Sequence, residues 1–297
     1  MTSILKCRPA TTVLALSVLA VGLFAVSAQG QSFAVPHAKI SLIAEDNGFQ
    51  AGHTEWVGVL FDLEKGWHIY WENPGDSGEP PKIQWQLPAG IRAGDVHWPA
   101  PVKLGTGTVI DYGYEGRVLL PVPLDVPASY KPAAHAALSA DVHYLICREV
   151  CIPAKANVSL AVPAPNQSPA DAVARREVFR SARDSWPKPM PAGWKVQATQ
   201  QGSQFVLDLD TGSQEMKAIF FPLEEDQIDN AAAQPVAPTA RGLRITLKKS
   251  DQLLKPISVL KGVIVLGSAG NGATTPGRAF EISVPVVVGR ASQRPQK

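Results

Sequence analysis

The stretch Val142-His-Tyr-Leu-Ile-Cys147-Arg-Glu-Val-Cys151-Ile-Pro153 holds two cysteines four residues apart. Its first five residues are rich in β-branched and aromatic side chains, which favour a strand over a helix. Four residues along a straight strand span about 13 Å, whereas a disulfide needs Cα atoms about 4.4–6.8 Å apart. If the two cysteines pair with each other, the chain must therefore turn at residues 148–150, at the end of a strand.

Short apolar segments separated by turn signals lie on both sides of this stretch, within residues 33–165. Such spacing is typical of an antiparallel β-sandwich. A Gly-rich loop opening onto a helix, as in nucleotide-binding α/β folds, is not found in this region. We expect strands at residues 39–44, 55–63, 68–71, 83–87, 117–122, 136–146 and 156–162.

A linker and one amphipathic helix are expected over residues 166–189. Ser168 suits the position that caps a helix, Pro169 suits the first helical position, and Asp171 places an acid in the first turn. Pro187 and Pro189 end the helix, which we expect to bridge two domains. Its expected apolar face is Val173, Val178, Phe179, Ala182 and Trp186.

The remaining sequence returns to strand patterns. Residues 190–290 alternate apolar and polar side chains in several places, as half-buried antiparallel strands do. We predict a second, smaller β-sandwich there and a tail at residues 291–297, which makes the whole chain all-β. Its strands are expected at residues 194–199, 204–209, 217–221, 243–248, 262–266 and 280–288.

The composition excludes several classes of protein. Of the 297 residues 45% are hydrophobic and 18% charged, a balance that disordered and fibrous chains do not have. Pro (26) and Gly (24) are too frequent for a helical bundle. The net charge of +2 falls to zero without Lys6 and Arg8, so nothing in the charge attracts nucleic acid or an anionic membrane.

The first 28 residues are predicted to be a secretory signal peptide. Lys6 and Arg8 precede an apolar run of 14 residues, and the small residues Ser27 and Ala28 suit a cleavage site. The run is shorter than the about 20 residues that span a bilayer, so we expect a soluble, exported protein that does not span a membrane. Cleavage would remove Cys7 and leave only Cys147 and Cys151, which can pair in an oxidising compartment.

The cysteine spacing alone leaves three roles open. Closing so short a loop stabilises a fold by about 2 kcal/mol, against nearly 5 for a loop of about 100 residues, so a purely structural disulfide is one reading and redox exchange is another. A metal site is the third. His143, Cys147 and Cys151 would align on a helix, although a strand would separate His143 from Cys147 by about 13 Å. Reduced cysteines alone could still hold copper(I).

Four motifs in the first half of the chain occur in the order of a known family. They are Gly66-Trp-His-Ile-Tyr-Trp71, Leu87-Pro-Ala-Gly90, Tyr114-Glu-Gly-Arg-Val-Leu-Leu-Pro121 and Tyr144-Leu-Ile-Cys147-Arg-Glu-Val-Cys151-Ile-Pro153. Together they resemble the N-terminal periplasmic domain of the thiol:disulfide interchange protein DsbD. The loop Asn73-Pro-Gly-Asp-Ser-Gly78 and the second sandwich are more similar to its relative in the suppressor-of-copper-sensitivity system.

The resemblance implies two immunoglobulin-like sandwiches and assigns roles to single residues. Cys147 and Cys151 would be the exchanging pair, with His68 and Tyr70 beside them. Residues 105–112 match a cap loop that shields the disulfide. The family's cap phenylalanine is missing here, so Ile110 or Tyr112 would provide the shielding. No cofactor is implied.

The resemblance also implies partners. Proteins of this family continue into a membrane electron-transfer domain and a thioredoxin-like domain, and neither follows in this sequence. We therefore expect a separate membrane electron-transfer protein or thioredoxin-like protein to exchange electrons with periplasmic disulfide proteins through this chain, in cytochrome c biogenesis or copper tolerance. The alternative is a non-enzymatic two-sandwich protein that binds copper(I) or a protein partner and has a structural disulfide.

Overall fold

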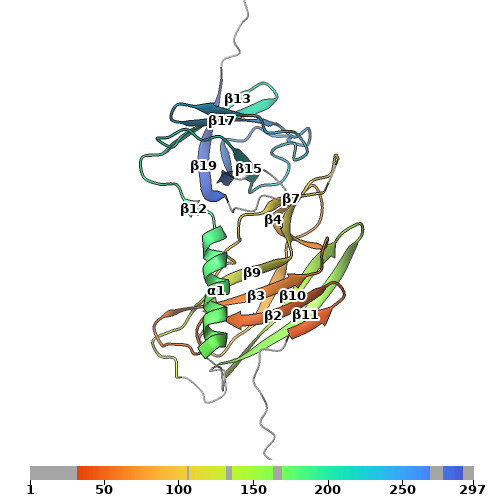
Figure 1. The fold of residues 1–297 in the computed structure, drawn as a ribbon, viewed down its shortest axis with the longest axis vertical. Coiled ribbons are helices and arrows are strands. Elements are labelled where there is room, and N and C mark those ends of the chain that lie inside the picture. The colour runs from red at the N-terminus through yellow and green to blue at the C-terminus, as the bar shows by residue number, and fades with distance from the viewer. Residues whose placement is uncertain (1–31, 106, 132–135, 163–168, 268–276, 290–297) are drawn as a thin grey trace, which may run out of the picture.

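The computed structural model describes residues 32–105, 107–131, 136–162, 169–267 and 277–289. Two β-rich units are stacked along the long axis of the molecule, and a single helix lies against the lower one (Figure 1). The expected all-β fold with one amphipathic helix is confirmed. The predicted leader at residues 1–28, the first linker residues 166–168 and the tail at 291–297 lie outside the described residues.

Two sheets form the first sandwich. One has the strand order β1-β2-β3-β9-β6 and consists of β1 (Ser32–Val35), β2 (Ala38–Ala44), β3 (Thr54–Leu63), β9 (Arg117–Asp125) and β6 (Arg92–Ala93). The other has the order β11-β10-β4-β8-β7, with β5 paired to β10. It consists of β11 (Cys151–Val162), β10 (Ala136–Cys147), β4 (His68–Gly75), β8 (Asp111–Glu115), β7 (Val102–Leu104) and β5 (Lys82–Gln86).

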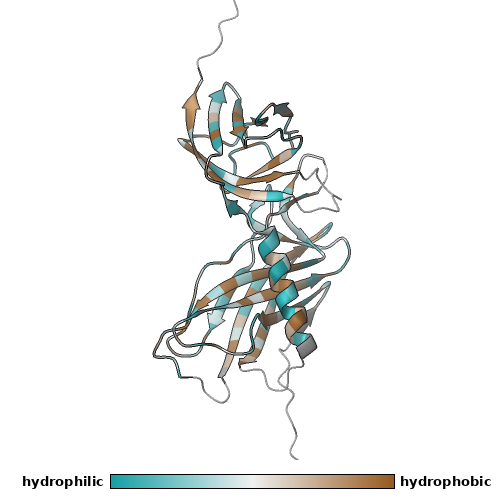
Figure 2. Ribbon diagram, turned by 60° about the vertical axis from the view of Figure 1, so that its left-hand side comes forward, coloured by the Kyte–Doolittle hydropathy of each residue, from teal (hydrophilic) through white to brown (hydrophobic). Residues whose placement is uncertain are grey.

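The alternating side chains of these strands build the core. In β2 every second residue is buried, and brown and teal bands alternate along the strands in Figure 2. In β3 and β9 both faces are buried, because the outer face carries Leu60 and Leu119 under the helix. Gly58 lies on that outer face, where a Cβ atom would come within 2.6 Å of Leu119.

The helix α1 (Pro169–Ser185) packs on the outer face of the first sandwich. Phe179 and Ala182 are buried there, and Val178 is partly buried. The prediction for Val173 is wrong, since its side chain is 66% exposed. At about 100° per residue, Val173 lies about 180° around the helix from Ala182, so the two cannot share a face.

The second unit is one sheet that curls around its own core. Its strand order is β15-β18-β19-β13-β14-β17-β16, with β12 beside β19. The expected antiparallel pairing holds for most strands, but β19 pairs in parallel with β12 and β13. Parallel neighbours need a long crossover, which the chain between β13 and β19 supplies. The strands are β12 (Lys188–Pro189), β13 (Lys195–Gln201), β14 (Gln204–Asp210), β15 (Ala218–Pro222), β16 (Val236–Thr239), β17 (Gly242–Lys248), β18 (Val259–Leu266) and β19 (Arg278–Val288).

The two units share an apolar interface. Phe221 of β15 is 2% exposed and packs edge-on against Trp71 and Tyr112 of the first sandwich. Asn73 of β4 donates a hydrogen bond of 2.8 Å to the carbonyl of Pro222. The contact is therefore a packed surface with specific polar pairs.

Within the described part of the chain, no helix has the length and apolar character needed to cross a bilayer.

Candidate functional site

A disulfide closes the end of the hairpin made by β10 and β11. Cys147 is the last residue of β10 and Cys151 the first of β11, and the two are directly opposite each other in the ladder. Their Cα atoms are 4.1 Å apart. Residues 148–150 make the predicted turn, in which the N–H of Arg148 donates to the carbonyl of Val150. Pro153 is accommodated because β11 is an edge strand.

Tyr70 lies against both sulfurs. Its hydroxyl donates to Cys147 Sγ at 3.0 Å and lies 3.2 Å from Cys151 Sγ. The tyrosine is completely buried, and Gly78 packs against its ring. His68 packs edge-on against Tyr70, with ring centroids 5.3 Å apart, and is directly opposite Cys147 in the ladder. Both residues are thus placed beside the disulfide, where the sequence resemblance expects them.

The two sulfur-bearing residues differ in exposure. Cys147 is 2% exposed, whereas Cys151 is exposed. The difference arises because Cys147 is covered by β4, while Cys151 begins an edge strand. Cys151 is therefore the more accessible residue of the pair, and Cys147 is the protected one.

Burial controls the protonation of the two aromatic neighbours. It raises the pKa of Tyr70, as does the nearby charge of Asp111 to a smaller extent, so the hydroxyl keeps its proton at neutral pH. It lowers the pKa of His68, with Glu115 acting in the opposite direction. The Nε2 atom of His68 is buried and has no hydrogen-bond partner among the described residues. The disulfide is thus flanked by a neutral hydrogen-bond donor and an uncharged imidazole.

The rim around Cys151 combines cationic and apolar groups. The guanidinium of Arg148 lies 5.4 Å from the ring of Trp67, and His37 stacks on the other side of that ring at 3.8 Å. Val150 is 64% exposed at the tip of the turn. Arg148 is also paired with the exposed carboxylate of Glu149 at 4.0 Å, so this surface presents a small apolar contact beside an ion pair.

Ile110 and Tyr112, the two residues expected to shield the disulfide, make their contacts elsewhere in the structure. The N–H of Ile110 donates to the Asp76 carboxylate at 2.7 Å, and its side chain packs against the first core. Tyr112 is fully buried against Phe221, and its hydroxyl donates to Asn230 of the second unit at 2.6 Å. The structure thus brings Tyr112 into the interface between the units.

The residues of the metal alternative are spread along a straight hairpin. His143 faces Lys82 on one neighbouring strand and Lys155 on the other. Four strand residues, about 13 Å, separate it from Cys147. Among the described residues no cluster of three or more His, Cys, Asp or Glu side chains is arranged to hold a metal ion.

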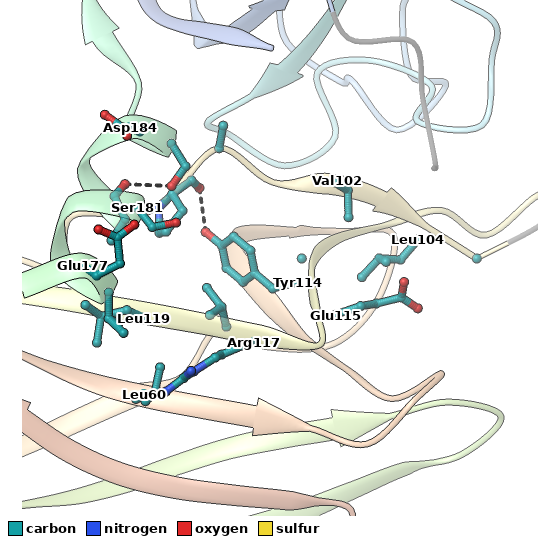
Figure 3. A pocket seen from close by; sticks show the side chains of 18 residues that line it. Leu60, Val102, Leu104, Tyr114, Glu115, Arg117, Leu119, Glu177, Ser181 and Asp184 are labelled. Carbon is teal, nitrogen blue, oxygen red and sulfur yellow. Dashed lines mark hydrogen bonds between the residues drawn. The ribbon is translucent and has the colours of Figure 1, made fainter. Parts of the chain in front are cut away.

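A separate hollow of about 780 Å³ lies between α1 and the strands β7, β8 and β9 (Figure 3). Tyr114 points into this region and donates to the carbonyl of Pro99 at 2.7 Å. The hollow is lined by neither cysteine nor by Tyr70. The disulfide therefore lies apart from this hollow, at the end of the hairpin.

Sequence reasoning missed the contribution of Asp76 and Asn230. Asp76 follows Gly75, whose φ of 90° brings the chain against the carbonyl of Ile110. The glycines of the quoted loop at residues 73–78 were a signal for such a close approach. Nothing in the sequence signals Asn230, which is 154 residues away from Asp76 and binds it directly.

The comparisons with known proteins agree with this geometry. Residues 40–163 match the family described as "Thiol:disulfide interchange protein DsbD, N-terminal". The structure is similar to the crystal structure of the N-terminal periplasmic domain of ScsB from Proteus mirabilis, with a TM-score of 0.63 and 18% identity. That similarity covers 86% of this chain and 97% of the other. A search of the curated proteins finds no match. The resemblance inferred from the sequence is thereby confirmed.

Proposed function

We propose that this chain is a thiol-disulfide exchange module that passes electrons to and from partner proteins through the Cys147–Cys151 disulfide. The family match supports this class of function. One observation carries the proposal further: a disulfide with one exposed and one buried cysteine, contacted at both sulfurs by a buried hydroxyl donor.

The exchange follows ordinary thiol chemistry. A thiolate of a reduced dithiol partner attacks Cys151 Sγ, the bond to Cys147 breaks, and Cys147 leaves with the electron pair. Tyr70 stabilises that leaving thiolate, because a hydrogen bond to an anion is stronger than one to a neutral group. The partner's second cysteine, as a thiolate, then attacks the sulfur of the partner's first cysteine in the mixed disulfide, and Cys151 is released as a thiolate. In sum two electrons and two protons enter this chain, and the partner's dithiol becomes a disulfide.

The pairing of the hairpin strands argues against the alternative that the disulfide is purely structural. β10 and β11 are already paired at twelve successive positions, of which the cysteine pair is the last. A bond that closes a three-residue turn at the end of such a ladder adds only about 2 kcal/mol. The exposure of Cys151 gives the bond an accessibility that a staple does not need.

The partners and the compartment follow from the resemblance. The similar domain of ScsB is described as periplasmic, and we extend that location to this chain after removal of the leader. The partners we propose are a membrane electron-transfer protein or a thioredoxin-like protein on one side and periplasmic disulfide proteins on the other. A domain that exchanges disulfides needs no bound cofactor, because the electrons travel in the sulfur atoms.

The test is to trap the mixed disulfide. Cys147→Ser keeps the exposed thiol and removes the resolving one. It is mixed with a thioredoxin-like protein that lacks its own second cysteine and whose remaining cysteine is activated as a disulfide with a small thiol. Attack by Cys151 should release the small thiol and give a stable covalent complex on a non-reducing gel. Cys151→Ser leaves only the buried thiol and should give far less complex.

The matched control is the double variant, which should give none. Equal trapping by both single variants would contradict the assignment of Cys151 as the attacked sulfur. If wild-type protein exchanged no electrons with any thioredoxin-like donor, the proposed function would be wrong.

A further inference from the structure

Asn230 of the second unit binds three separate points of the first sandwich. Its Nδ2 donates to Asp76 Oδ1 at 2.7 Å, its Oδ1 accepts from the Tyr112 hydroxyl at 2.6 Å, and its carbonyl accepts from Lys103 Nζ at 2.7 Å. Lys103 precedes residues 105–110 and Tyr112 follows them. One side chain and its backbone therefore hold both ends of this segment, at a site where Asn230 is only 6% exposed.

Asp76 connects this contact to the segment itself. While its Oδ1 binds Asn230, its Oδ2 accepts from the N–H of Ile110, and its own N–H donates to the Ile110 carbonyl at 3.0 Å. Both carboxylate oxygens are thus engaged, one toward the second unit and one toward residues 105–110. If Asn230 moved away, Asp76 would lose one of its two side-chain partners, and its carboxylate would hold Ile110 less firmly.

The same loop contacts the tyrosine at the disulfide. Gly78, two residues after Asp76, lies so close to the Tyr70 ring that a Cβ atom would come within 2.1 Å of it. Tyr70 in turn donates to Cys147 and contacts Cys151. A continuous path of direct contacts therefore leads from Asn230 through Asp76 and the loop at residues 75–78 to the sulfur atoms.

Asn230 is presented on a stiff turn. The carboxylate of Asp229 accepts from the N–H groups of Ala231 and Ala232 and from Lys248 Nζ. The N–H of Asp229 donates to the carbonyl of Lys248 in β17. The turn thus transmits the position of the second sheet to the first sandwich.

We propose that Asn230 is a positioning residue for the disulfide, through which docking of the second unit restrains the loop at residues 75–78, Ile110 and Tyr70. This proposal rests on the proposed function and deepens it: the second unit, which holds no cysteine, regulates the reactivity of the pair. A partner that shifts the second unit would displace the Tyr70 hydroxyl and make the disulfide slower to reduce, because the leaving Cys147 thiolate would lose its hydrogen-bond donor.

The test is the rate at which dithiothreitol reduces the oxidised full chain. Asn230→Asp keeps the shape and the bond to Tyr112 but sets a carboxylate against Asp76, and Asn230→Ala removes the side chain. Gln234→Ala is the matched control, because Gln234 makes two hydrogen bonds to Phe220 within the second unit. We expect reduction to be about fivefold slower in both Asn230 variants, the size of a modest coupling between sites, and unchanged in the control.

A second arm asks whether the effect passes through Tyr70. In a Tyr70→Phe background the slowing by Asn230→Asp should largely disappear, since the hydroxyl that it displaces is already gone. An unchanged or faster rate in Asn230→Asp, or the same slowing with and without the Tyr70 hydroxyl, would overturn the proposal. Because dithiothreitol replaces the protein partner, this outcome is independent of whether the chain exchanges with a thioredoxin-like protein.

Discussion

Two buried tyrosines on neighbouring strands bind different partners through their hydroxyl groups. Tyr70 on β4 contacts both sulfurs of the disulfide, whereas Tyr112 on β8 donates to Asn230 across the interface with the second unit. Both side chains are 0% exposed and sit in the same six-stranded sheet. One region of this sheet therefore contacts the disulfide and the other contacts the second unit, and the loop at residues 75–78 lies between them.

The largest change in stability is expected from a substitution in the interface between the two units. Phe221→Ala takes away the ring that packs against Trp71 and Tyr112 and should lower the free energy of unfolding by about 3–5 kcal/mol. Replacing both cysteines by serine should cost only about 2 kcal/mol. Denaturant unfolding of both variants measures the two values. A larger loss of unfolding free energy in the cysteine variant than in Phe221→Ala would mean that the disulfide, and not the interface between the units, contributes more to stability.

Removing each hydroxyl separately sharpens the comparison. Tyr112→Phe leaves the Oδ1 atom of Asn230 buried without that donor and should lower stability by about 1–3 kcal/mol. Tyr70→Phe should change stability less but raise the pKa of the Cys147 thiol in the reduced protein, because the thiolate loses its donor. Chemical unfolding and the pH dependence of alkylation measure the two effects. Identical behaviour of the two variants would mean that the tyrosines are not specialised.

A smaller effect is expected from pH at the interface. Burial and the charge of Glu281 raise the pKa of Glu72 to about 7, and both residues line a hollow between the units, together with Asp95 and His97. A carboxyl that binds its proton more tightly in the folded state makes stability fall as pH rises from about 4.5 through 7. The side chain stays partly exposed, so the loss should be below about 1 kcal/mol.

Glu72→Gln tests that expectation. The variant should flatten the decline of the melting temperature between pH 5 and pH 8, with wild-type protein measured in parallel. A decline as steep as that of wild type would assign the pH dependence to other groups.

The smallest effect is expected on the exposed face of α1. Val173→Ser should change the free energy of unfolding by no more than about 0.5 kcal/mol, because the side chain is largely in solvent. Phe179→Ala, on the buried face of the same helix, is the contrasting variant and should cost several kcal/mol. A substantial loss from Val173→Ser would place that residue in a contact that the fold does not show.

Local patterns predicted much of this fold because they are set by neighbouring residues. Period-two alternation located most of the strands in both units, and the spacing of Cys147 and Cys151 predicted the turn between them. β8 was missed, because four of its five residues are buried and Gly113 interrupts its pattern. That glycine is required, since a Cβ atom there would come within 2.0 Å of the Ile69 carbonyl.

The sequence alone thus established the strand-rich units, the hairpin and a cysteine pair able to bond, because each depends on the spacing of residues close together along the chain. Only packing in three dimensions set which cysteine is exposed, which tyrosine reaches the sulfurs and which asparagine of the second unit holds Asp76. Such contacts join residues 77 to 154 positions apart. Their strength depends on burial and direction, which a linear pattern does not encode.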